Sequence, residues 1–208
     1  APGTKWLADK YPEKDYQSIK LLTDCLNNVK TNNLVLISTI AVYPDPINVD
    51  EDSFIDKSKL SPYGFNRRQL EIFLENNFDV TILRLPALFG KGLRKNVLYD
   101  LINKVQLNKI NTHSIYQFYN LANLTADINK ALSNNINVLN IATSPIMLNT
   151  LIHSCFDYKI DNNVIVQPRI ENMVTKFGSY WSSETSYLYS KKSILKEFKK
   201  FIKKKIIN

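Results

Sequence analysis

Two short apolar runs constrain the fold of this chain more than any other feature of its sequence. The first occupies residues 34–37 in "LVLIST", and the second occupies residues 80–85 in "VTILRL". Neither run alternates apolar and polar side chains, which is typical of a strand covered on both faces. Between them lies an amphipathic segment that opens with Ser61 and Pro62 and places Leu70 on its apolar face. A strand, a helix and a second strand at this spacing predict a parallel sheet with right-handed crossovers.

The rest of the chain continues the alternation of helices and strands, so we expect an α/β fold. A Pro-containing acidic stretch at residues 43–62 fits neither a strand nor a long helix and predicts a loop over a site. Further helices are expected at residues 12–30, 94–106 and 123–134, from about residue 148, and at 190–208, with a further strand in 137–143.

Composition limits the class of protein. With 208 residues, of which 44% are hydrophobic and 22% charged, the chain resembles an ordinary globular domain with one sizeable core. Cys25 and Cys155 form no CxxC pair, which argues against a disulfide framework or a zinc cluster and fits a reducing compartment. No run approaches the ~20 apolar residues of a membrane span, and Ala1 begins no basic and apolar leader. We therefore expect a cytoplasmic protein with no membrane contact and no bound metal.

The formal net charge of +8 is concentrated near the C-terminal end of the sequence. Residues 190–208 hold eight lysines against one glutamate, a net +7. Ile194, Phe198 and Ile202 recur there at helical spacing, which predicts a terminal helix whose apolar stripe packs on the rest of the protein. The favoured interpretation is a solvated lysine face, so we do not expect nucleic acid as a partner. An anionic ligand, a membrane or RNA are the alternatives.

The predicted chemistry rests on residues at the carboxyl edge of the sheet, where ligands of parallel sheets bind. Thr39 follows the first apolar run, and Tyr63 begins the next helix. A phenol ionises only near about pH 10 unless a cation stabilises the phenolate. Arg67 lies four residues after Tyr63, on the same helical face, where it can supply that cation. With the Thr39 hydroxyl orienting a ligand oxygen, these residues predict a site that interconverts a carbonyl and an alcohol.

Five segments in order along the chain carry a resemblance to a known family. They are "LVLISTIAVY", "SPYGFNRRQLE", "VTILRLPALFG", "QFYNLANLTADINKAL" and "VLNIATSPIMLNTLI". Together they resemble the extended branch of the short-chain dehydrogenase/reductase superfamily, the NAD-dependent epimerase/dehydratase family. The resemblance implies a Rossmann-like parallel sheet with flanking helices, whose N-terminal strands are missing or supplied elsewhere. It also implies one partial domain over residues 1–208, in which residues 92–122 and 156–208 form a smaller, substrate-binding part.

The resemblance also assigns roles to individual residues. Thr39, Tyr63 and Arg67 take the positions of the family's catalytic Ser/Thr, tyrosine and lysine. NAD or NADP is the implied cofactor, a nucleotide sugar is the implied substrate, and a homodimer is one assembly that the resemblance allows. The implied cofactor contacts are Pro2, Ser38, Arg67, Leu85, Pro86 and Leu88, and the implied substrate contacts are Ala87, Lys95, Asn96, Gln117 and Tyr119.

Departures from the family limit the function that can be expected. Arg67 replaces the family's lysine, and its planar fork would hold a ribose differently. Ala87 replaces an asparagine that would contact substrate, and Ile40 and Ala41 replace the acid pair of the dehydratases, which makes dehydration the least expected reaction. None of the five glycines can form the GxxGxxG turn that holds a dinucleotide pyrophosphate.

Two functional hypotheses follow. The favoured one is an NAD(P)-dependent oxidoreductase or epimerase, in which Tyr63 exchanges a proton with a nucleotide sugar, Thr39 orients the reacting oxygen, and Arg67 stabilises the phenolate and holds the cofactor ribose. The alternative is a non-catalytic binding or scaffold protein that has lost dinucleotide binding. Because "APGTKW" resembles the segment after the family's fourth strand, we expect an apolar sheet edge that is open to a longer chain, a partner or a second copy.

Overall fold

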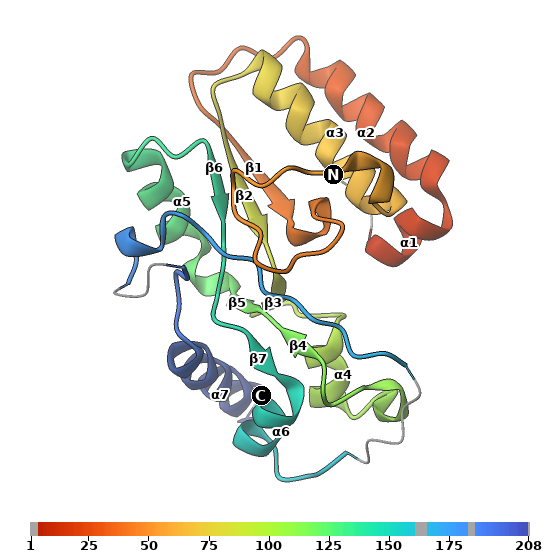
Figure 1. Ribbon diagram of the computed structural model, residues 1–208, viewed down its shortest axis with the longest axis vertical. Helices are drawn as coiled ribbons and strands as arrows, with labels where there is room; N and C mark the ends of the chain where they lie inside the picture. Colours follow the sequence, from red (N-terminus) through yellow and green to blue (C-terminus); the bar gives the residue numbers. More distant parts are fainter. Residues whose placement is uncertain (1–3, 161–165, 183–185, 208) are drawn as a thin grey trace.

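The computed structural model describes residues 4–160, 166–182 and 186–207. Its elements form two lobes: a three-stranded sheet with its helices lies in the upper part of Figure 1, and shorter strands with three helices lie below it. The upper sheet consists of β1 (Leu34–Thr39), β2 (Val80–Leu85) and β6 (Val138–Asn140) in the order β1-β2-β6. Both strand pairings are parallel, so the predicted parallel α/β sheet is confirmed.

Helices cover both faces of this sheet (Figure 1). Val80 and Ile82 pack against α2 and α3, whereas Leu83 and Leu85 pack on the opposite face, where α5 lies. All six side chains of β2 are buried as a result, which explains its uninterrupted apolar sequence. The bounds of these helices are α1 (Lys5–Lys10), α2 (Pro12–Leu26), α3 (Pro62–Asn77) and α5 (Leu124–Ser133).

The start of α3 lies close against the end of β1. The Ser61 hydroxyl caps the helix by accepting a hydrogen bond from the Gly64 N–H. Gly64 also faces the single-turn helix η1 (Ile40–Val42), and a Cβ at this position would lie 2.2 Å from the Ala41 carbonyl oxygen. Glycine therefore permits the close approach that holds Tyr63, the preceding residue, at the carboxyl rim of the sheet.

The lower lobe has a core of its own. Phe89, Leu101, Phe118, Leu151 and Phe198 are buried in it and come from five different elements. β3 pairs with β5 in parallel, and β4 pairs with β7 in antiparallel orientation. Its elements are β3 (Ala87–Phe89), α4 (Val97–Asn103), β4 (Ile115–Tyr116), β5 (Phe118–Asn120), β7 (Ile146–Met147), α6 (Leu148–Cys155) and α7 (Lys191–Ile207). Single-turn helices lie at Lys57–Lys59, Leu107–Lys109, Leu121–Asn123 and Gly178–Tyr180.

β1 forms one edge of the three-stranded sheet, as the resemblance predicted. Within the described ranges no strand pairs with its outer side. Ile37 is 46% exposed although it belongs to an apolar run. An open strand edge with exposed apolar side chains is a surface on which a further strand can pair. In the part of the chain that the structure describes, no helix is long and apolar enough to cross a membrane.

Candidate active site

The structure brings the three predicted catalytic residues together. Thr39, Tyr63 and Arg67 line one cavity of about 70 Å³, together with Ser38 and three apolar residues of β1 and α3. Thr39 comes from the end of β1, whereas Tyr63 and Arg67 come from the first two turns of α3. The cavity has room for small groups such as a few waters or one end of a ligand, because sites for whole ligands are several times larger.

The hydroxyl of Tyr63 is open to a ligand. Among the described residues, no group forms a hydrogen bond with its phenol oxygen, while the Tyr63 backbone N–H donates to Asp9 at 2.9 Å. Partial burial acts to raise the pKa of Asp9, but hydrogen bonds from Tyr63 and Lys5 outweigh it and lower that pKa. The Tyr63 ring lies near two cations, since Arg67 is 4.6 Å and the Lys5 amine 5.9 Å from the ring centroid.

The hydroxyl of Thr39 is only partly used. Its oxygen accepts a hydrogen bond of 3.2 Å from the Ala41 N–H and so caps η1. A threonine hydroxyl has one donor as well as acceptor sites, and no acceptor for the Thr39 proton is present in the described part of the chain. Thr39 and Tyr63 therefore line the same cavity, and within the described residues the proton of neither hydroxyl is donated to an acceptor.

Arg67 differs from its predicted role. Its Nη2 donates to Asp15 Oδ1 at 2.9 Å and its Nη1 donates to Asp15 Oδ2 at 3.2 Å, in an ion pair whose side chains are 7% and 4% exposed. Asn66 adds a third hydrogen bond to the same carboxylate at 2.9 Å. Because the adjacent carboxylate offsets the guanidinium charge, the predicted stabilisation of a Tyr63 phenolate by Arg67 is weakened. The fork is also occupied by Asp15, which corrects the expectation that it holds a cofactor ribose.

Ser38, which was predicted to contact the cofactor, lines the cavity and also belongs to a buried hydrogen-bond network between β1, β2 and α3. Its hydroxyl donates to Glu71 at 2.5 Å. Arg84 binds the same carboxylate through Nε at 3.1 Å and Nη2 at 2.8 Å, and its Nη1 donates to the Tyr43 hydroxyl at 2.7 Å. Burial acts to lower the pKa of Arg84, but Glu71 outweighs it and raises that pKa; burial also raises the pKa of Tyr43. This network fixes the floor of the site.

The other predicted cofactor contacts occupy the end of β2 and the strand after it. Leu85 and Pro86 are buried, and Leu88 is half-buried in β3. Pro2 lies outside the described residues. Leu85, Pro86 and Leu88 therefore lie at the carboxyl end of β2 and just after it, and they remain proposals as cofactor contacts.

Two of the predicted substrate contacts belong to the core. Gln117 is fully buried; its Nε2 donates to the carbonyl oxygens of Thr143 and Met173, both at 2.6 Å, and its Oε1 accepts from the Met173 N–H at 2.8 Å. Tyr119 is also fully buried, and its hydroxyl donates to Asp127 at 2.5 Å. Both side chains are therefore enclosed by protein in this arrangement, and their expected contact with substrate is corrected to a structural role.

The remaining predicted substrate contacts lie between β3 and α4. Asn96 caps α4, because its Oδ1 accepts from the Leu98 N–H at 3.0 Å and its Nδ2 donates to the Leu88 carbonyl oxygen at 2.8 Å. It also borders a cavity of about 300 Å³. Lys95 is exposed beside it, and Ala87 is half-buried in β3.

A larger cavity lies against the stretch at residues 43–62, which the sequence predicted to be a loop over a site, although the side chains that complete the lining were not predicted. Its volume is about 350 Å³, and its lining includes Lys5, Lys59, Ser61 and Arg169. Arg169 also lines the 300 Å³ cavity near α4, so one cation borders both spaces. Glu171 receives a hydrogen bond from Arg169 at 2.6 Å, while burial raises the pKa of Glu171. Each of the three cations is paired with a carboxylate, Lys5 with Asp9 at 3.1 Å, Lys59 with Asp56 at 3.3 Å and Arg169 with Glu171 at 2.6 Å. Asp45 also lines this cavity, so its positive charge is largely offset.

No metal centre is evident in the described ranges, where histidine, cysteine, aspartate and glutamate form no group of three or more suited to a metal ion. No protein-family model and no curated protein matches the sequence. Solved structures provide the comparison.

Three solved structures show the same fold. A double mutant of the dTDP-glucose 4,6-dehydratase from Streptomyces venezuelae, with NAD bound, matches with a TM-score of 0.71 at 12% identity, over 98% of this chain and 70% of that chain. The UDP-glucuronic acid 4-epimerase of Bacillus cereus, in complex with UDP-glucuronic acid and NAD, has a TM-score of 0.64 at 19% identity, over 91% and 67%. The UDP-glucose 4-epimerase of Thermotoga maritima, with UDP-glucose, has a TM-score of 0.65 at 13% identity, over 100% and 76%. The likeness confirms the Rossmann-like fold that the sequence predicted.

Proposed function

We propose that these residues belong to an NAD-dependent enzyme that oxidises or epimerises a nucleotide sugar. The observation that carries the proposal is the pair of hydroxyls, Thr39 and Tyr63, which border one cavity at the carboxyl rim of a parallel sheet with unused hydrogen-bonding capacity among the described residues. Ligands bind at this rim in α/β folds of this kind. The neighbours that share the fold include enzymes solved with NAD and with nucleotide sugars, which supports the same chemical class.

In this proposal Tyr63 moves the proton and Thr39 holds the oxygen. The Thr39 hydroxyl donates to the oxygen of a sugar hydroxyl or carbonyl, and the Tyr63 phenol oxygen exchanges a proton with that same oxygen. The cap that Thr39 makes with the Ala41 N–H fixes the direction of its hydroxyl. Gly64 lets α3 approach η1, which keeps the two hydroxyls on one cavity.

Asp15 and Arg67 would act together in positioning Tyr63. The buried ion pair clamps α2 to α3, and the guanidinium then lies against the Tyr63 ring at 4.6 Å. A cation held on the ring face stabilises the ring orientation by about 0.5–2 kcal/mol. The proposal therefore assigns Arg67 to orientation of the phenol, with its charge largely offset by Asp15.

The residues of this chain fit only part of an NAD molecule. Bound NAD would accept or return a hydride, and the rim formed by Thr39, Leu85 and Leu88 could contact its reactive end. None of the five glycines in the sequence belongs to a GxxGxxG pattern that could hold the pyrophosphate. The proposal therefore places in this chain the residues that bind substrate and move the proton.

The phosphates of a nucleotide sugar would occupy the cavities that Arg169 borders. Lys5, Lys59 and Arg169 border this space, and a phosphate would compete for them with their present partners Asp9, Asp56 and Glu171. Arginine binds phosphate through a planar, two-pronged geometry. The combined space of about 350 Å³ and 300 Å³ is within the range of small-ligand sites. The sugar would then point toward Thr39 and Tyr63.

The direct test uses the complete protein, mixed with NAD and a panel of UDP- and dTDP-sugars. Formation of reduced nicotinamide, followed by its absorbance, or conversion of one sugar epimer to another, followed by chromatography, is the expected result. Calorimetric titration that shows nucleotide-sugar binding without turnover would leave a binding protein as the function. Absence of both binding and turnover across the panel would contradict the proposal.

A further inference from the structure

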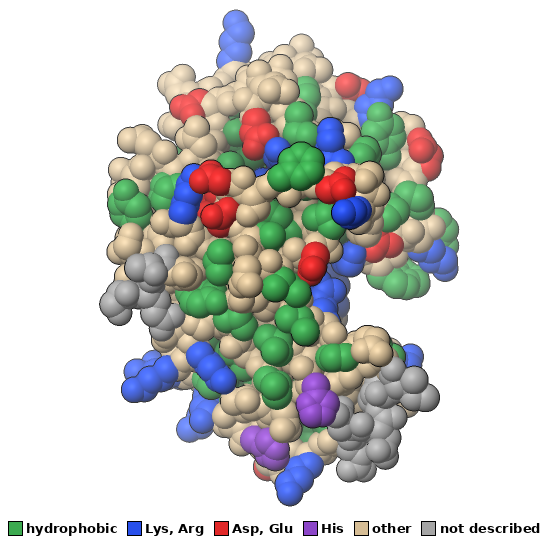
Figure 2. Space-filling model, viewed as in Figure 1, with side chains coloured by type: hydrophobic (Ala, Val, Ile, Leu, Met, Phe, Trp, Pro, Cys, Tyr) green, Lys and Arg blue, Asp and Glu red, His purple; other side chains and the backbone are tan. Residues whose placement is uncertain are grey.

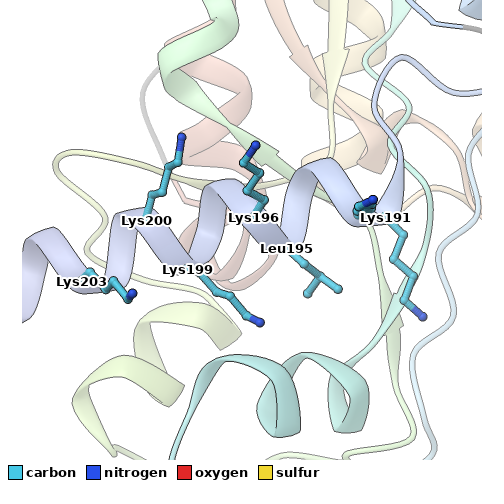
Figure 3. A pocket seen from close by; sticks show the side chains of 7 residues that line it. Lys191, Leu195, Lys196, Lys199, Lys200 and Lys203 are labelled. Carbon is cyan, nitrogen blue, oxygen red and sulfur yellow. The ribbon is translucent and has the colours of Figure 1, made fainter.

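The lysine-rich face of α7 is a surface that the proposed reaction does not use. Six exposed lysines and Leu195 border a shallow concavity of about 750 Å³ along this helix (Figure 3). On the face drawn in Figure 2, carboxylates gather over the upper lobe, while lysine and arginine side chains project around the lower lobe that contains α7. The six lysines are Lys191, Lys192, Lys196, Lys199, Lys200 and Lys203.

The charge of this face is not neutralised by the protein. Glu197, the only carboxylate of α7, turns toward the lobe, where its Oε2 accepts hydrogen bonds from Asn120 at 2.9 Å and Asn123 at 3.2 Å. Within the described ranges, none of the six lysines forms an ion pair or a side-chain hydrogen bond. Six cations with free ammonium groups therefore face solvent along one helix.

The apolar side of α7 is already occupied. Ile194, Phe198 and Ile202 are 0%, 1% and 6% exposed because they pack in the core of the lower lobe. The Phe201 ring packs against Phe89, with centroids 5.9 Å apart. Over residues 191–204, whose side chains the structure describes, the helix has no free apolar stripe to insert into a bilayer and no exposed aromatic ring on which unpaired bases could stack. Electrostatic contact with phosphate is the interaction that remains.

We propose that the lysine face of α7 binds the phosphate backbone of duplex nucleic acid, without regard to base sequence. The row from Lys191 to Lys203 is about 18 Å long at 1.5 Å per residue. A duplex carries roughly ten phosphate charges over that length, about twice as many as a single strand. This differs from the solvated face favoured by sequence, because Glu197 faces inward and the lysines follow one another along the helix, with side chains that project to both sides of it (Figure 3).

The complete protein tests this surface in a fluorescence anisotropy titration with a labelled DNA duplex. With about six phosphate contacts, affinity is expected to fall by roughly a thousandfold between 50 and 200 mM salt. A single strand of the same length is expected to bind more weakly, because it offers fewer charges. Tighter binding to the single strand or to vesicles of anionic lipid than to the duplex would overturn the proposal.

Two variants that lose the same charge distinguish binding at the lysine face of α7 from non-specific attraction to the net positive charge of the protein. Neutralising three lysines of α7 is expected to weaken duplex binding at least tenfold and to reduce the slope of log affinity against log salt by about 3. Neutralising three exposed lysines in or just after α2 is expected to leave the slope unchanged. Equal effects of both variants would overturn the proposal. The variants are Lys196→Gln, Lys199→Gln, Lys203→Gln for α7 and Lys14→Gln, Lys20→Gln, Lys30→Gln for the control.

Discussion

Two buried arginine–carboxylate pairs flank α3, and they differ in what they do for a neighbouring tyrosine. Arg84 of β2 binds Glu71 under the sheet, and Arg67 of α3 binds Asp15 of α2 at the rim. In both pairs two guanidinium nitrogens contact the two carboxylate oxygens, and both pairs are almost fully buried. Each arginine also contacts a tyrosine, so the two regions consist of the same three kinds of side chain.

The tyrosine oxygen distinguishes the two regions. Tyr43 accepts a hydrogen bond from Arg84 at 2.7 Å and donates to the Asp50 carbonyl oxygen at 2.7 Å, so its hydroxyl is saturated by the protein. The Tyr63 ring packs against the Arg67 guanidinium, and the Tyr63 oxygen forms no hydrogen bond within the described ranges. A cation beside a tyrosine therefore does not by itself mark a catalytic group. The proposed role of Tyr63 rests on its oxygen, which no described residue bonds.

The largest effect is expected when the pair under the sheet is broken. Glu71→Ala leaves the Arg84 guanidinium buried without a counter-charge and should lower the free energy of unfolding by about 3–5 kcal/mol. Denaturant unfolding followed by circular dichroism measures it. Glu75→Ala, on the same helix but partly exposed, is the control and should cost less than about 1 kcal/mol. An equal loss of unfolding free energy in Glu71→Ala and Glu75→Ala would contradict the stronger role assigned to the buried Glu71–Arg84 pair.

The second variant tests whether the Asp15–Arg67 ion pair affects the turnover rate as well as the free energy of unfolding. Asp15→Asn should cost about 2–3 kcal/mol of unfolding free energy, because Arg67 loses its counter-charge and keeps one acceptor. Loosening the clamp between α2 and α3 should also lower the turnover rate per folded molecule, because Arg67 then holds the Tyr63 ring less firmly. Glu71→Gln should destabilise the fold with a smaller effect on that rate. An unchanged rate in Asp15→Asn would limit the Asp15–Arg67 pair to stability.

The third variant tests the reassignment of Gln117 to the core. Gln117→Ala leaves the carbonyl oxygens of Thr143 and Met173 and one N–H without partners, at a cost of about 2 kcal/mol. Its KM for a nucleotide sugar should remain that of the unmodified protein. A raised KM with unchanged thermal stability would return Gln117 to the substrate pocket.

The smallest effect concerns Asp9, a partly exposed carboxylate of α1 that accepts a hydrogen bond from the Tyr63 N–H at the start of α3. Its pKa in the folded protein is lowered below the usual 3.8, so its contribution to stability is present above that pH and is lost as the pH falls through the folded value. Asp9→Asn keeps an acceptor for the Tyr63 N–H and should cost only about 0.5 kcal/mol near neutral pH. Urea titrations of both proteins at pH 7 and at strongly acidic pH should converge at the acidic end. A difference that persists there would contradict the electrostatic cause.

Elements with strong local signals were predictable from sequence. β2 matches its predicted range, and α3 begins at the predicted proline. The short helix α1 was not predicted, because its six residues are too few to show a periodic pattern. The pairing of β3 with β5 was also missed, since these strands have three residues each.

The partners of the site residues could not be predicted. Asp15 lies 52 positions before Arg67, and Met173 lies 56 positions after Gln117, so no local spacing relates them. Sequence reasoning placed Thr39 and Tyr63 at one rim because the carboxyl ends of parallel strands share an edge. Whether each hydroxyl is free or already bonded depends on tertiary contacts that no short motif encodes.

The central claim is that the free Tyr63 oxygen transfers a proton at the cavity it shares with Thr39. The most direct measurement is the rate of nicotinamide reduction by the complete protein carrying Tyr63→Phe, beside Tyr43→Phe as the matched variant of the saturated tyrosine. The account predicts that Tyr63→Phe lowers the rate at least about a hundredfold with an unchanged unfolding midpoint, while Tyr43→Phe, which removes a hydroxyl bonded by Arg84 and Asp50, lowers the midpoint. Full turnover in Tyr63→Phe would contradict it.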